Sequence, residues 1–166
     1  MKVFTSYFYQ IRHFKKNMIP ISTAQWDPKW FHDFTGNYEY VFKDKRGIYN
    51  GIRCEDFHFD YDLYGQNNDA CGEACKDKNP ETCNFLKNYR KCLDEKDFDG
   101  LYKELERIAN KVQELEQFEE EPWIVLIVYE VPSNQCSERR VLQEWFKDNG
   151  IDIKELSYPI EKKEKK

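Results

Sequence analysis

Cys136 occupies the most chemically suggestive position in the sequence. It follows a continuous apolar run, and it opens a segment whose apolar spacing predicts a helix over residues 136–148. A thiol at the N-terminal end of a helix, with Arg139 and Arg140 close by, is favoured as the thiolate, which is the nucleophilic form. We therefore predict Cys136 as a catalytic nucleophile with Glu130 as the acid–base. The alternative is a small side chain that packs at the start of the helix.

The middle of the sequence holds a second group of thiols: Cys54, Cys71, Cys75 and Cys83. Four thiolates bind zinc tetrahedrally or hold an iron–sulfur cluster, and zinc is the preferred prediction. The C-x16-C-x3-C-x7-C spacing matches no standard zinc module, and His58 could replace Cys54 as the fourth ligand. Unligated thiols in a reducing compartment are the alternative.

Aromatic and basic residues follow the ends of several predicted strands. Ligands bind outside the carboxyl ends of the strands in open α/β sheets, so these side chains would share one crevice if the strands are parallel neighbours. Aromatic faces and cations suit a nucleobase with phosphate, in a nucleotide or in a flipped or single-stranded base. The alternative for the tryptophans is that they cap the core. The predicted substrate-binding residues are Ser6, Tyr7, Trp26, Lys29, Trp30, Arg139 and Arg140.

Length and composition indicate a folded protein. Of the 166 residues, 40% are hydrophobic and 16% aromatic, which is enough to bury a core. No apolar run approaches the roughly 20 residues that cross a bilayer, and Met1–Ser6 is typical of a first strand rather than of a signal peptide. We therefore expect a cytoplasmic protein with reduced thiols that does not bind a membrane.

The net charge of −5 is spread unevenly along the chain. Residues 1–53 carry nine Lys or Arg against four Asp or Glu, whereas residues 54–122 carry nine against nineteen. A protein that binds nucleic acid mainly by neutralising phosphates would be more basic. The basic first third is consistent with a local site for an anion, and the alternative is an ordinary solvated surface.

Hydrophobic periodicity predicts one α/β domain over residues 1–160, with a charged tail over 161–166. Residues 36–84 are predicted to form a loop-rich insertion, which contains the four cysteines predicted to bind metal and at most one short hairpin. A continuous apolar run is typical of a strand covered on both faces, which favours a small, mostly parallel sheet flanked by helices. The predicted strands are Val3–Phe8, Ile19–Ser22, Trp123–Tyr129 and Ile151–Leu156.

Three helices are predicted around this sheet. Asn79 as N-cap and Pro80 at the first helical position predict one helix start, with Cys92 on the core face of that helix. Cys136–Asp148 is predicted as the last helix, with Gly150 ending it. A longer helix is predicted to begin at Asp97 or Asp99 and to continue to about Gln117, and its spacing predicts burial of Leu101, Leu105, Ile108, Val112 and Leu115.

Several of these segments resemble an uncharacterised bacterial and phage family, domain of unknown function 488. Many members have Cys-His-Arg where this chain has Cys136-Ser137-Glu138-Arg139, so the most obvious acid–base partner of the thiol is missing. The resemblance implies an α/β fold with a site near the shared blocks, and no established activity. Those blocks are Thr5–Phe8, Ile19–Ser22 and Pro28–Phe31 near the N-terminus; Cys71, Cys75, Cys83–Leu86 and Tyr89 in the middle, as in a cysteine-bearing branch; and Tyr129–Pro132 with Cys136 to Phe146.

Two functions are consistent with these residues. The first is an enzyme with a cysteine-centred pocket at the strand ends, acting on a nucleotide or a nucleic-acid base. The alternative is a non-catalytic, metal-stabilised binding module, such as a phage or mobile-element accessory protein. The phage setting is implied by the family resemblance only.

Overall fold

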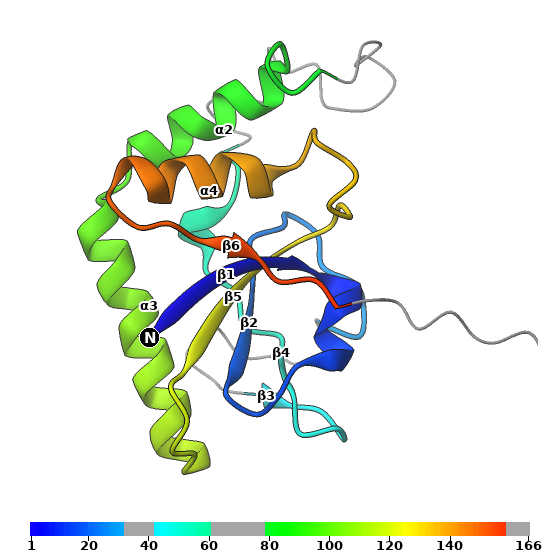
Figure 1. Cartoon of the computed structure of the whole chain (residues 1–166), viewed down its shortest axis with the longest axis vertical. Coiled ribbons are helices and arrows are strands. Elements are labelled where there is room, and N and C mark those ends of the chain that lie inside the picture. The colour runs from blue at the N-terminus through cyan, green and yellow to red at the C-terminus, as the bar shows by residue number, and fades with distance from the viewer. Residues whose placement is uncertain (32–41, 61–78, 159–166) are drawn as a thin grey trace, which may run out of the picture.

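The computed structural model of the chain describes residues 1–31, 42–60 and 79–158 (Figure 1). Among these residues, every helix is too short or too polar to span a lipid bilayer. The strands are β1 (Lys2–Tyr7), β2 (Met18–Ser22), β3 (Phe42–Lys43), β4 (Tyr49–Asn50), β5 (Trp123–Val128) and β6 (Lys154–Glu155). The helices are the 3₁₀ helices η1 (Phe8–His13) and η2 (Glu55–Phe57) and the α-helices α2 (Asn84–Asp94), α3 (Phe98–Glu116) and α4 (Glu138–Asp148).

A parallel four-stranded sheet in the order β2-β5-β1-β6 forms the centre of the protein, which confirms the predicted α/β fold. Trp123 of β5 lies opposite Lys2 of β1 on one side and opposite Met18 of β2 on the other. Pro20 lacks an amide hydrogen, and it is tolerated because β2 is an edge strand. A separate antiparallel pair, β3 and β4, lies within the region predicted as loop-rich.

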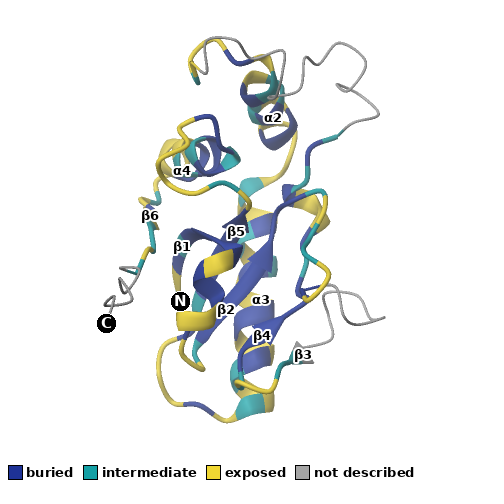
Figure 2. Cartoon of the chain, turned by 90° about the vertical axis from the view of Figure 1, so that its right-hand side faces the viewer, coloured by how far each residue is buried: buried dark blue, intermediate teal, exposed yellow. Residues whose placement is uncertain are grey.

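Side chains of β5 alternate between two hydrophobic clusters, one on each face of the sheet. Ile124, Leu126 and Val128 pack with apolar side chains of α2, α3 and α4. Val125 and Ile127 pack on the opposite face with η1 and with the segment after β2. All five are buried (Figure 2), and each such side chain stabilises the fold by about 1.5–3 kcal/mol. The prediction of a strand covered on both faces is confirmed.

One helix begins later than its capping signal predicts. The side chain of Asn79 accepts the backbone amide hydrogen two residues further on, which closes a turn, and α2 begins only at Asn84. The last helix, α4, begins at Glu138, within two residues of its predicted start, and the side chain of Ser137 caps it. The predicted helix start at Asn79 is therefore wrong. The physical reason is that such side-chain bonds stabilise turns as well as helix ends.

The predicted core positions hold except near the end of α3. Its buried positions include Leu101 and Leu105, whereas Leu115 is exposed. Figure 1 shows that the last turn of α3 extends beyond the sheet, so the apolar spacing continues after the core has ended. Cys92 is buried in the same cluster as the helices, as predicted. The last strand is shorter than the predicted 151–156, because only the two residues of β6 pair with β1.

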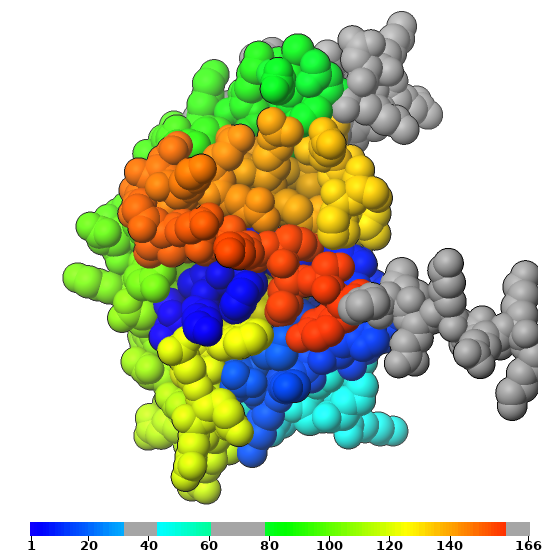
Figure 3. Space-filling view, in the orientation of Figure 1, coloured from blue at the N-terminus to red at the C-terminus, as the bar shows by residue number. Residues whose placement is uncertain are grey.

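A buried ion pair secures the short strand β6. Nε of Arg139, in the first turn of α4, donates to Oε2 of Glu155 at 2.8 Å, and the hydroxyl of Thr5 donates to the same oxygen at 2.6 Å. Arg139 is 7% exposed, and its Nη2 also donates to the carbonyl oxygen of Glu130 at 2.5 Å. The guanidinium therefore joins α4, β6 and the turn after β5. In Figure 3 the chain after α4 (red) lies against both α4 and the N-terminal residues.

Replacing Arg139 tests this link. Arg139→Ala leaves the carboxylate of Glu155 without its cation, so we expect the free energy of unfolding to fall by about 3 kcal/mol. The matched control is Arg140→Ala, because the neighbouring side chain is exposed and its nearest carboxylate oxygen is 3.6 Å away. Its loss should stay below about 1 kcal/mol. Urea unfolding measures both, and equal losses would contradict the structural role of Arg139.

Candidate functional site

The carboxyl ends of β1, β5 and β2 lie side by side, because the three strands are parallel neighbours. The segments that follow these strands meet through aromatic rings. The ring of Phe8, directly after β1, lies 4.9 Å from the ring of Tyr129, which follows β5. It lies 6.2 Å from the ring of Trp30, which follows β2. Three distant parts of the sequence therefore contact one another at this edge of the sheet.

A cleft of about 390 Å³ opens beside Trp30, between η1 and the β3–β4 hairpin. Its volume lies within the roughly 300–1,000 Å³ of small-molecule sites. Asn50 is 2% exposed, and its Oδ1 makes no hydrogen bond within the described part of the chain. Three aromatic rings, two arginines, a carboxylate and an amide line the cleft: Phe8, Tyr9, Arg12, Trp30, Asp44, Arg46 and Asn50.

The two arginines of the cleft differ in how their charge is balanced. Nε of Arg46 donates to Oδ2 of Asp44 at 2.7 Å. Burial raises the pKa of Asp44, but hydrogen bonds from Arg46 and from two backbone amides outweigh it and keep this pKa below its usual value. Arg12 instead lies over the ring of Tyr9, with its guanidinium carbon 3.7 Å from the ring centre. Among the described residues, no carboxylate pairs with Arg12.

Cys136 lies outside the lining of this cleft, in the turn between β5 and α4. It is 9% exposed, and its backbone amide donates to Oδ1 of Asn134 at 3.0 Å. The predicted acid–base Glu130 accepts a hydrogen bond at 3.0 Å from the hydroxyl of Ser137, the residue after the thiol. The structure therefore brings Glu130 close to the Cys136 turn, and the catalytic role of the pair stays a prediction.

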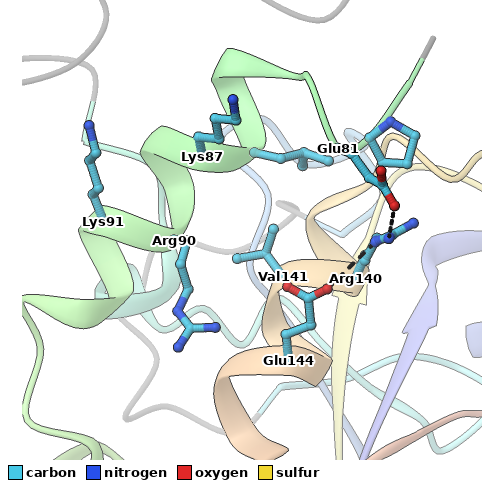
Figure 4. Close-up of a pocket in the computed structure, with 9 residues that line it drawn as sticks. Glu81, Lys87, Arg90, Lys91, Arg140, Val141 and Glu144 are labelled. Carbon is cyan, nitrogen blue, oxygen red and sulfur yellow. Dashed lines mark ion pairs between the residues drawn. The ribbon is translucent and has the colours of Figure 1, made fainter. Parts of the chain in front are cut away.

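Arg140 faces α2 and lines a second hollow, of about 620 Å³, between α2 and α4 (Figure 4). Its guanidinium forms ion pairs with Glu144 at 3.6 Å and with Glu81 at 4.0 Å. Arg90, on the α2 side of the hollow, pairs with Asp148 at 2.6 Å. These arginines are paired with carboxylates, whereas Lys87 and Lys91 also line the hollow and add two further cations.

The other predicted substrate-binding residues fall into two groups. Ser6 and Tyr7 are buried: the Ser6 hydroxyl donates to the carbonyl oxygen of Leu156 at 2.6 Å, and the Tyr7 hydroxyl accepts from Gln10 at 2.7 Å. Both side chains therefore stabilise the fold. Trp26 and Lys29 are exposed and lie in the segment after β2 that also carries Trp30.

The cysteines predicted to bind metal are only partly within the described residues. Cys54 and Cys83 are buried in the same hydrophobic cluster, and burial raises the pKa of Cys54 to about 12. Cys71 and Cys75 lie outside the described residues. Within 1–31, 42–60 and 79–158, no three His, Cys, Asp or Glu side chains are grouped as metal ligands. The four-cysteine zinc site stays a prediction.

An ion-pair cluster at the end of β2 was not predicted from the sequence. The hydroxyl of Ser22 donates to Asp27, and Nη1 of Arg53 lies 3.3 Å from Oδ2 of the same carboxylate. Nη2 of Arg53 lies 3.2 Å from Nδ1 of His58. The cluster joins the segment after β4 to the loop that carries Trp30. An acidic residue shortly after an apolar strand was the only signal, since no sequence spacing connects positions 27, 53 and 58.

No protein family, curated protein or solved structure matches the chain. The resemblance to domain of unknown function 488 therefore stays a prediction. Any function has to be argued from the contacts and charges of the site itself.

The pH dependence of stability tests the acidic surroundings at the start of α4. Burial, together with the charge of Glu130, raises the pKa of Glu138 from 4.5 to about 8. The folded protein thus holds a proton that the unfolded chain releases, so this stability is full below pH 4.5 and is lost as the pH rises towards 8. The loss is at most about 1.4 kcal/mol per pH unit. Glu138→Gln should flatten this decline in urea unfolding between these pH values, and Glu144→Gln, on the exposed side of α4, should not. A decline that persists in Glu138→Gln would contradict the assignment.

Proposed function

We propose that the protein binds a nucleotide, or one base of a nucleic acid, in the cleft beside Trp30. The observation that carries this proposal is the combination of exposed aromatic rings with an unbalanced guanidinium in one small cleft. Trp30 is 45% exposed, so part of its surface is open to a stacking base. Arg12 supplies a planar, permanently charged donor for a phosphate.

Asn50 supports the same ligand class. A buried acceptor without a hydrogen bond costs about 1–3 kcal/mol, and a ligand that donates to it recovers that cost. An amide pairs well with a base edge that presents a donor beside an acceptor. Stacking on Trp30, pairing with Asn50 and a phosphate on Arg12 are the three contacts that a nucleotide would make.

The proposal concerns binding. Because Cys136 does not line the cleft, the observed contacts support a binding module better than a cysteine-centred enzyme. Catalysis by Cys136 and Glu130 stays a prediction, as does stabilisation of the module by a metal.

Calorimetric titration with AMP, GMP, CMP and UMP tests the proposal, with ribose 5-phosphate as the ligand that lacks a base. At least one nucleotide should bind more tightly than ribose 5-phosphate. Trp30→Ala should weaken that nucleotide by about fivefold or more, which is the lower end of what one base–aromatic stack contributes. Arg12→Ala should reduce its affinity to that of the corresponding nucleoside.

Two exposed residues of α3 provide matched controls. Leu115→Ala removes an exposed apolar side chain that does not line the cleft, and Arg107→Ala removes a surface arginine that pairs with Glu104. Neither should change nucleotide affinity. If all four nucleotides bind no better than ribose 5-phosphate, or if Leu115→Ala weakens them as much as Trp30→Ala does, the cleft is not a nucleotide site.

A further inference from the structure

Exposed apolar side chains gather at the edge of the sheet that holds the cleft. Six large apolar side chains are strongly exposed in the described part of the chain, and only Leu115, on α3, lies elsewhere. Trp26 is the most open of them, with 75% of its surface in contact with water. Exposed apolar side chains that gather on one part of the surface mark an interaction site, whereas single ones are ordinary. The five at the sheet edge are Tyr9, Trp26, Trp30, Tyr129 and Val131.

The rings follow one continuous path that leads out of the cleft. The ring of Phe8 lies next to the ring of Trp30 and next to the ring of Tyr129, and so connects the two. Asp27, which follows Trp26 in the chain, is held at the end of β2 by the hydroxyl of Ser22 and by Arg53. Trp26 therefore lies beside the carboxyl end of β2, at the same edge of the sheet as Trp30 and Tyr129.

We infer that the ligand of this edge is a single-stranded nucleic acid several nucleotides long, an inference that rests on the proposed function. A mononucleotide would use the rings of the cleft and leave Tyr129 and Trp26 without a contact. A single strand presents one base after another, and every base has a face that stacks on an aromatic ring. The path therefore offers stacking positions for successive bases on either side of Phe8.

Charge favours a single strand over a duplex. Duplex DNA is held mainly through its phosphates, and the net charge of −5 opposes such binding. Paired bases also hide the faces that exposed rings would contact. Arg46 is paired with Asp44, which leaves Arg12 and the exposed Lys29 as cations beside the aromatic path for about two phosphate contacts. Binding would depend on stacking much more than on phosphate neutralisation.

Fluorescence anisotropy with fluorescein-labelled dT9 tests the inference, with unlabelled dT9, dT3 and dTMP as competitors. We expect unlabelled dT9 to bind at least about tenfold more tightly than dTMP, since two further stacking positions are filled. Affinity should fall only slightly with salt, with a log–log slope of about −1.4 for two phosphate contacts. A slope several times steeper would overturn the stacking mechanism.

Substitutions along the path separate this inference from the proposed function. Trp26→Ala and Tyr129→Ala should each lower the ratio of dT9 affinity to dTMP affinity by about fivefold or more, and Leu115→Ala should leave it unchanged. If dTMP binds through Trp30 but dT9 binds no more tightly, the inference fails and the proposed function stands. If neither thymine ligand binds, the inference fails, and the titrations with AMP, GMP, CMP and UMP decide the proposed function separately. Self-association of the chain that Trp26→Ala abolishes, without oligonucleotide binding, would identify the path as a protein interface and overturn the inference.

Discussion

Burial of β5 on both faces is the constraint on which the rest of the structure depends. A strand with apolar side chains on both faces needs cover on both, and here three α-helices cover one face while η1 and the segment after β2 cover the other. Because its two neighbours are parallel to it, every connection must return to the same end of the sheet. The segments after β1, β2 and β5 therefore all begin at one edge. This topology explains why Phe8 contacts both Trp30 and Tyr129.

Two ion-pair clusters fix the segments on either side of the aromatic path. Arg139 binds Glu155 on the β6 side, and Arg53 binds Asp27 on the β2 side. Buried ion pairs add little net stability compared with apolar packing, so their clearer effect is to favour one arrangement of the loops they join. A binding edge gains from this arrangement, since rings held in place before a ligand arrives lose less conformational entropy when it binds.

The sequence predicted those parts of the fold that carry a long, regular signal. The run Trp123–Val128 identified the central strand, and the spacing of α3 identified its buried side up to Val112. Of the seven residues that line the cleft, only Trp30 was among the predicted site residues. Arg12 was missed because the short helix η1 gives no periodic signal, and Arg46 and Asn50 were missed because they belong to a hairpin whose strands are two residues long. The same limit applies to Asp27 and Arg53, which meet only after the chain has folded.

The thiol at position 136 shows why neighbours in sequence are a weak guide to electrostatics. Its predicted reactivity depended on positive charge from Arg139 and Arg140, but the first is bound to Glu155 and the second faces Glu144 and Glu81 on the α2 side. The turn also carries Glu130, whose charge helps to keep the buried Glu138 protonated up to about pH 8. Because both guanidiniums are paired, the start of α4 offers an anionic ligand less free positive charge than Arg12 does, since no carboxylate pairs with Arg12 among the described residues. For a ligand that has both rings and phosphates, this difference in charge favours an orientation with phosphate on the η1 side and bases along the rings towards Tyr129.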